Sequence, residues 1–132
     1  MKTSFLLPIA ILISCFTCLH AAAQSTSGVK SVTEISIDNK GKEITRSFKS
    51  YDAQGNLVEE KQYDDDGKLK DHVRYEYNAA NLKVKETHVA SDDKPVEITT
   101  YEYDEKGNRI AKTEMDGTGK VTSRKKYVYE YY

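Results

Sequence analysis

The stretch YEYDEKGNR, residues 101–109, decides the fold, because versions of it recur along the chain. The second tyrosine of each copy falls at a constant interval of 26 residues, at Tyr51, Tyr77, Tyr103 and Tyr129. A second, weaker series lies midway between these marks, at Ile37, Tyr63, Val89 and Met115. A strict interval of this kind is the signature of a repeat. Each repeat is therefore expected to hold two strands and two turns.

Turn residues separate the expected strands at short intervals. An Asp or Asn opens most turns, and a Gly three residues later supplies the positive φ that a tight turn needs. Asn81 takes the Gly position in one turn, and the turn with Asp93 and Pro95 departs most from the pattern. Eight strands are expected, near residues 29–37, 43–51, 57–63, 69–77, 83–89, 96–103, 109–115 and 121–131.

These strands predict an all-β fold. Past the N-terminal segment the sequence has no sustained helical period, and short turns join antiparallel neighbours. We therefore expect an antiparallel up-and-down meander of about eight strands built from 26-residue repeats. A thinner apolar stripe of Val58, Val84 and Ile110 lies on the second face. Apolar residues on both faces favour an open curled sheet over the alternative, a small closed barrel.

The N-terminal segment, residues 1–23, has the organisation of a secretory signal peptide. One lysine precedes an apolar run at residues 5–19, shorter than the ~20 residues of a membrane-spanning helix. Three alanines follow, and they predict cleavage after Ala23. The alternative is a lipoprotein anchored at Cys15, because residues 12–15, LISC, resemble a bacterial lipobox.

Cleavage would leave a flexible leader at residues 24–28 and one β domain at residues 29–132. Both cysteines, Cys15 and Cys18, would leave with the signal peptide, so the mature chain would have no disulfide. Without Lys2 the 20 basic residues become 19 against 21 acidic ones, which excludes the basic footprint of a nucleic-acid-binding protein. We expect an exported protein, periplasmic, cell-surface or secreted, with no transmembrane segment in the mature chain.

Nine of the ten tyrosines have odd residue numbers. Odd residues share one face of a sheet as long as the turns keep register, because side chains alternate across a strand. A shared register gives the rows Tyr51·Leu57·Tyr75, Tyr77·Lys83·Tyr101 and Tyr103·Arg109·Tyr127. Lys83 and Arg109 would then each lie between two tyrosine rings. The candidate binding residues are Tyr51, Tyr75, Tyr77, Lys83, Tyr101, Tyr103, Arg109 and Tyr127.

A metal site is the second candidate. The same register places His72 opposite His88, with Glu60 on the next strand, and two imidazoles with a carboxylate can bind zinc. Two unrelated surface histidines are the simpler interpretation. Residues 64–67, DDDG, resemble a calcium loop but lack the EF-hand spacing. No motif joins a nucleophile to a base, so we expect no enzyme activity and no cofactor.

The pattern Tyr-x-Tyr-Asp-x-x-Gly-Asn, followed by a shorter Asp-x-x-Gly turn, resembles the YD repeats of the Rhs family. Residues 51–58 and 101–110 match best, and the resemblance covers about residues 44–131. In large members such repeats form a hollow β shell around a toxin, and some cell-surface members are associated with binding carbohydrate or partner cells. About three and a half repeats are too few to close a shell. The resemblance therefore implies the fold and export.

These patterns predict a non-enzymatic exported YD-repeat protein, a binding or structural module of bacterial origin. Its tyrosine-rich face would contact a glycan or a surface protein, since rings beside Lys and Arg suit both. A simpler interpretation is that the tyrosines are the core of the sheet. A metal-binding or hydrolytic site around His72 and His88 is the alternative function. An open sheet also leaves two edges for self-association, at residues 29–37 and 121–131.

Overall fold

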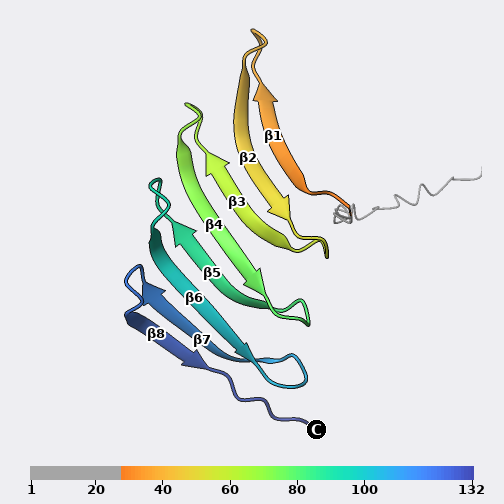
Figure 1. Ribbon diagram of the computed structural model, residues 1–132, viewed down its shortest axis with the longest axis vertical. Coiled ribbons are helices and arrows are strands. Elements are labelled where there is room, and N and C mark those ends of the chain that lie inside the picture. The colour runs from red at the N-terminus through yellow and green to blue at the C-terminus, as the bar shows by residue number, and fades with distance from the viewer. Residues whose placement is uncertain (1–27) are drawn as a thin grey trace, which may run out of the picture.

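The computed structural model describes residues 28–132, which form one antiparallel sheet (Figure 1). The strands lie side by side in sequence order: β1 Ser31–Ile37, β2 Glu43–Tyr51, β3 Leu57–Tyr63, β4 Leu69–Tyr77, β5 Lys83–Val89, β6 Pro95–Tyr103, β7 Arg109–Asp116 and β8 Val121–Lys126. The expected signal peptide at residues 1–23 lies outside the described residues. Nothing within residues 28–132 forms a helix with the length and apolar character to cross a membrane.

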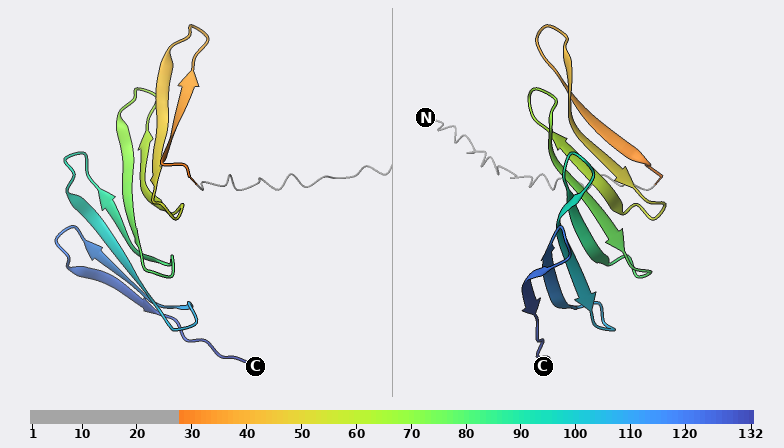
Figure 2. Two further views of the ribbon diagram at one scale, coloured as in Figure 1. Left: turned by 45° about the vertical axis from the view of Figure 1, so that its right-hand side comes forward. Right: turned by 60° about the vertical axis from the view of Figure 1, so that its left-hand side comes forward.

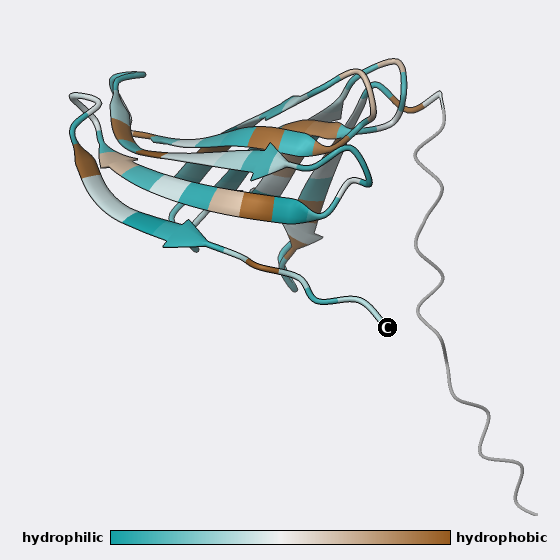
Figure 3. Ribbon diagram, turned by 90° about the horizontal axis from the view of Figure 1, so that it is seen from below, coloured by the Kyte–Doolittle hydropathy of each residue, from teal (hydrophilic) through white to brown (hydrophobic). Residues whose placement is uncertain are grey.

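The sheet is open. Within the described residues each strand contacts only its neighbours in sequence, so β1 and β8 do not meet. The strands fan out with a strong twist (Figure 2), and seen from below the sheet curls into a trough (Figure 3). The prediction of an all-β, up-and-down, open curled sheet is confirmed. A small closed barrel is excluded.

The strand boundaries follow the sequence prediction, and β2 to β5 match it residue for residue. The largest difference is β8, which ends at Lys126 and not at residue 131. β8 ends early because the last residues of a nine-residue strand need a following strand to pair with. The last residues of β4, Tyr75 to Tyr77, pair with β5 and not with β3. Within the described residues no strand follows β8, so the equivalent residues 127–129 have no ladder to join.

One hydrogen-bond pattern builds all seven turns in the described part of the chain. In the second turn, Asp52 N donates to Asn56 O at 2.9 Å and Gly55 N donates to Asp52 O at 3.0 Å. The Asp52 carboxylate also accepts from two backbone N–H groups of its own turn. Positive φ falls on the fourth residue of every turn, with Asn81 (57°) and Asp93 (64°) in place of Gly. The predicted turn chemistry is confirmed.

A bulge follows six of these seven turns. Tyr77 pairs with Lys83, but Glu76 pairs with Lys85, so one residue of β5 is extra. The same shift occurs beside the turn in each later hairpin and in the β2–β3 and β3–β4 hairpins. A shift of one residue exchanges the faces on which odd and even residues lie.

The bulges overturn the parity argument of the sequence analysis. The face with Tyr75 and Tyr101 holds the odd residues of β4 and β6, but the even residues of β5 and β7, because paired residues share a face. We call it the tyrosine face. The prediction was wrong for five residues, which the register places on the opposite face: Tyr63, Leu69, Val89, Met115 and Val121.

Because the sheet is a single layer, few side chains are fully covered. Val73 (4% exposed) and Val89 (7%) are the buried apolar residues of the described chain. Three buried polar residues accompany them, His72, Thr99 and Thr113. The tyrosines of β2 to β6 are half-buried. They are neither the closed core of a two-layer fold nor a freely exposed surface.

Tyrosine hydroxyl groups tie each hairpin to the next. Tyr77 Oη donates to the Leu57 carbonyl at 2.9 Å, and Tyr103 Oη donates to the Lys83 carbonyl at 2.6 Å. Tyr129 repeats the contact with the Arg109 carbonyl at 2.8 Å. Each acceptor lies beside a bulge, where the strand ladder is interrupted. We call these three contacts the tyrosine locks.

Removing one lock tests its contribution to stability. Tyr103→Phe keeps the ring and leaves the Lys83 carbonyl without its donor, so the free energy of unfolding should fall by about 1 kcal/mol in urea titrations. Tyr63→Phe is the matched control, because the described residues give the Tyr63 hydroxyl no hydrogen-bond partner. Equal losses in both variants would show that the lock contributes nothing.

Candidate binding face and grooves

The tyrosine face alternates aromatic and charged strands. β4 contributes Tyr75 and β6 contributes Tyr101, and β5 lies between them. On β5 the bulge brings Lys83 and Glu86 onto this face, where the parity argument placed only Lys83. The result is a row of rings with charged side chains between them.

Lys83 lies at the centre of this row. Its Nζ is 5.1 Å from the centroid of the Tyr75 ring and 5.3 Å from that of Tyr101, within cation–π range of both. The same Nζ donates to Glu86 Oε2 at 2.6 Å. Lys83 thus lies between two tyrosine rings as predicted. Its backbone pairs with Tyr77 as predicted, but its Nζ contacts the ring of Tyr75.

Arg109 is the second cation of the face. Its Cζ is 4.5 Å from the centroid of the Tyr101 ring, so Tyr101 receives both Lys83 and Arg109. The prediction placed Arg109 between Tyr103 and Tyr127. The pairing with Tyr103 is confirmed, whereas Tyr127 N donates to the carbonyl of the next residue, Ile110. Among the described residues Arg109 has no carboxylate partner, and its side chain is exposed.

Glu86 joins the cluster from β5. Its carboxylate accepts from Lys83, from the Tyr101 hydroxyl at 3.4 Å, and lies 3.3 Å from His88 Nε2. Burial opposes ionisation of Glu86, but the hydrogen bond and charge of Lys83, with those of His88, lower its pKa. Burial and the carboxylates of Glu60 and Glu86 raise the pKa of Tyr75 to about 12. Both shifts favour the state that each group already has at neutral pH.

The Tyr75 pKa predicts how stability changes in alkali. The phenol ionises near pH 10 in the unfolded chain and near pH 12 in the fold, so the stability from its neutral form is complete below pH 10. It should be lost between pH 10 and pH 12. Urea unfolding at stepped pH should show this fall, and Tyr75→Phe should show a smaller one. An identical fall in both proteins would contradict the assignment.

The two histidines do not form a site. His88 pairs with Val73 and His72 pairs with Lys61, so the imidazoles lie on opposite faces. The predicted pairing was wrong by one residue because of the bulge between β4 and β5. His72 is buried and its Nε2 lies 2.7 Å from Glu59 Oε1. No cluster of three His, Cys, Asp or Glu residues with metal-binding geometry occurs within residues 28–132.

Residues 64–67 form a strand-connecting turn. Asp64 Oδ1 accepts from the backbone N–H groups of Asp66 and Lys68, as the side chain of the first residue does in five other turns. The interpretation as a strand connection accounts for these contacts.

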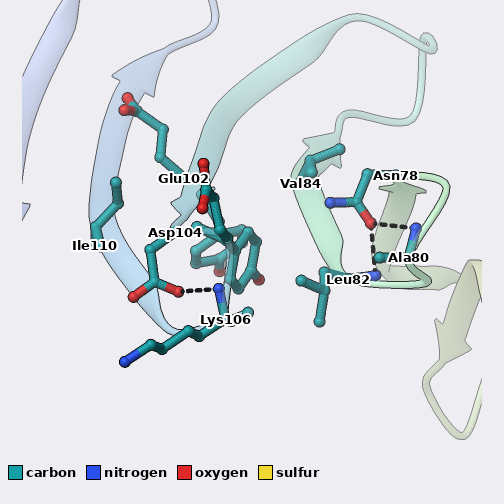
Figure 4. Close-up of a pocket in the computed structure, with 12 residues that line it drawn as sticks. Asn78, Ala80, Leu82, Val84, Glu102, Asp104, Lys106 and Ile110 are labelled. Atoms are coloured by element: carbon teal, nitrogen blue, oxygen red, sulfur yellow. Dashed lines mark hydrogen bonds between the residues drawn. The ribbon is translucent and has the colours of Figure 1, made fainter.

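Two grooves open where successive turns lie side by side. The larger, about 710 Å³, lies between the turns at residues 78–82 and 104–108 (Figure 4). The other, about 570 Å³, lies one repeat earlier, between residues 52–56 and 78–82. Their linings correspond at 26-residue offsets: Tyr75, Tyr77, Val58 and Glu76 in one, Tyr101, Tyr103, Val84 and Glu102 in the other.

The grooves gather four of the predicted binding residues, namely Tyr75, Tyr77, Tyr101 and Tyr103. Neither Lys83 nor Arg109 lines them, because both cations lie against the rings on the tyrosine face. Sequence reasoning missed Glu76 and Glu102. The signal that marks them was present, since both stand between the two tyrosines of a repeat.

Comparisons with known proteins give little further guidance. No family model matches the chain, and no curated protein matches it. Among solved structures, it is similar to a chain from a crystal structure of a GtfA/B complex bound to UDP and GlcNAc, with 17% identity and a TM-score of 0.30. The match covers 71% of this chain and 24% of that one. A TM-score this low carries no argument about function.

Proposed function

We propose that this chain is a non-enzymatic, exported binding module of the YD-repeat type that holds an extended neutral glycan along the turn edge of its sheet. The observation that supports it best is the recurrence of one groove at an offset of 26 residues. A ligand made of repeating units can occupy such grooves in succession, and each weak contact then adds to the affinity.

The lining of the grooves suits sugars. Tyr101 and Tyr103 offer apolar ring surface. Val84 and Ile110 add aliphatic surface (Figure 4). Glu102 is exposed and can accept hydrogen bonds from sugar hydroxyls. Apolar surface with a few convergent polar groups is the usual composition of a small-molecule site.

The charge of the grooves favours a neutral ligand. The larger groove is lined by three carboxylates, Glu102, Asp104 and Glu105, against one cation, Lys106. The smaller one has Asp52 and Glu76 and no cation in its lining. An anionic polysaccharide would meet like charge in both grooves, which costs affinity.

The proposal of a non-enzymatic role follows from the chemistry of the face. Lys83, Glu86 and Tyr75 have each other as partners, and the pKa shifts of the last two hold them in their neutral-pH states. A general acid or base works best with a pKa near the working pH. The cluster is suited to holding the rings in place.

A titration of tyrosine fluorescence tests glycan binding. The chain has ten tyrosines and no tryptophan, so its emission reports on the proposed surface. Neutral polysaccharides should quench the emission of the purified protein saturably, and anionic ones should not. The double variant Glu76→Ala/Glu102→Ala removes an exposed carboxylate from each groove and should weaken binding at least tenfold.

The control is Glu97→Ala, which removes an exposed carboxylate from the other end of β6, outside both grooves. It should bind like the wild type. If no neutral polysaccharide quenches the wild type, or if both variants bind equally well, the glycan proposal fails. The sheet would then be a structural module or the surface for a protein partner.

Export is tested by the N-terminus of the protein recovered from a bacterial host. Cleavage after Ala23 should give a chain that begins at Gln24, measured by intact mass and N-terminal sequencing. A chain that begins at an acylated Cys15 would support the lipoprotein alternative. An uncut N-terminus in the cytoplasmic fraction would contradict export.

A further inference from the structure

The two edge strands each lack a neighbour that equivalent strands have. In β4 the last residues reach past β3 and pair with β5, and in β6 they reach past β5 and pair with β7. Residues 127–129 are in the same position of the repeat, after the last β7–β8 pair at Lys126. No following strand covers them in the described chain.

Residues 127–129 nevertheless keep two hydrogen bonds to β7. Tyr127 N donates to the Ile110 carbonyl at 3.0 Å, and Tyr129 makes the third tyrosine lock at 2.8 Å. Val128, between them, is 80% exposed. Along a strand, the backbone N–H and C=O groups of successive residues point alternately to one neighbouring strand and to the other. Since the Tyr127 N–H points toward β7, the N–H and C=O of Val128 point away from β7, toward the open edge.

β1 leaves apolar residues exposed that are covered in equivalent strands. Ile37 has the repeat position of Val89, yet Ile37 is 65% exposed and Val89 7%. Val32 has the position of Val58 and Val84, which are half-buried, and is itself exposed. Tyr51 N donates to the Lys30 carbonyl, so the backbone groups of Lys30 point toward β2. By the alternation along a strand, the backbone groups of Thr33 point toward the open edge. Within residues 28–132, β1 has no preceding strand.

We propose that a second copy of this chain supplies both missing neighbours, and that residues 124–129 of one copy pair antiparallel with β1 of the next. The β6–β7 register, moved on by one repeat, fixes the pairs. Tyr129 lies opposite Ser31 of the next copy, and Val128 lies opposite Thr33 of the next copy. Val32 of the next copy becomes the bulge residue, as its repeat equivalents Val58 and Val84 are.

Charge complementarity supports this pairing. Lys125 pairs within its own sheet with another cation, Lys112. In the proposed register it lies opposite Ser36 of the next copy, with Glu34 and Asp38 of that copy two residues to either side on the same face. Two carboxylates thus surround a lysine that has a like charge on its other side.

Apolar surface is covered on the opposite face. Arg124 lies across from Ile37 of the next copy, and Lys126 across from Ile35, which is 47% exposed. The aliphatic stems of Arg and Lys can cover such residues while their charged groups reach water.

The same residues disfavour symmetric pairing. Two β8 edges would bring Arg124, Lys125 and Lys126 against a second set of the same cations. Two β1 edges would leave residues 127–129 of both copies uncovered. The proposed contact is head-to-tail, and such contacts build open chains unless their rotation closes a ring.

Two edge-blocking variants distinguish these arrangements by sedimentation velocity. Thr33→Pro removes an outward N–H from β1, and Val128→Pro removes one from the β8 edge, and neither N–H is needed within the sheet. The purified wild-type protein, with its N-terminus determined, should form dimers and larger species as its concentration rises. Each variant alone should be a monomer, and an equimolar mixture should stop at the dimer.

Every other outcome overturns the head-to-tail contact. A wild type that stays monomeric up to its solubility limit excludes self-association. If Val128→Pro alone forms dimers, β1 pairs with β1, and if Thr33→Pro alone does, β8 pairs with β8. Should circular dichroism show that a proline variant is unfolded, charge reversal takes its place. Lys125→Glu should then weaken association, and adding Glu34→Lys to the same chain should restore it, whereas no change in either variant contradicts the register.

Discussion

A single-layer sheet has no second layer to pack against, and this constraint governs the whole molecule. With Val73 and Val89 as its buried apolar residues, the described chain must be held by its hydrogen-bond ladder and by contacts between neighbouring hairpins. The tyrosines supply those contacts in two ways. Tyr77 and Tyr103 lock a hairpin to the preceding one through their hydroxyls, whereas Tyr75 and Tyr101 pack their rings against Lys83. A smaller aromatic residue without a hydroxyl could do only the second.

Much of this fold could be predicted because its information is local. An Asp or Asn at the first position of a turn and a residue with positive φ at the fourth fix each hairpin within a few residues of chain. Asn81 was recognised in a glycine position for the same reason. Strand order followed from short turns alone, since hairpin-linked strands have to be neighbours.

The sheet face on which each side chain lies could not be predicted, because it depends on the one extra residue in each bulge. A bulge beside each of six turns exchanges odd and even positions, and nothing in the spacing of the tyrosines reveals it. This one effect separated His72 from His88. It also brought Glu86 onto the tyrosine face, where its carboxylate joins Lys83. Pairs next to a turn were predicted correctly, and those beyond the bulge were not.

In a sheet held only by contacts between neighbouring hairpins, each end strand lacks one neighbour. Every interior strand has a neighbour on both sides, whereas within the described chain β1 and residues 127–129 have a neighbour on one side. The two edges differ in chemistry: β1 exposes Ile35 and Ile37, whereas β8 carries Arg124 and two lysines. Natural sheets use such cations to prevent edges of the same kind from pairing. In the proposed head-to-tail contact the basic edge meets an edge with Glu34 and exposed isoleucines, whereas two basic edges would place like charges against each other.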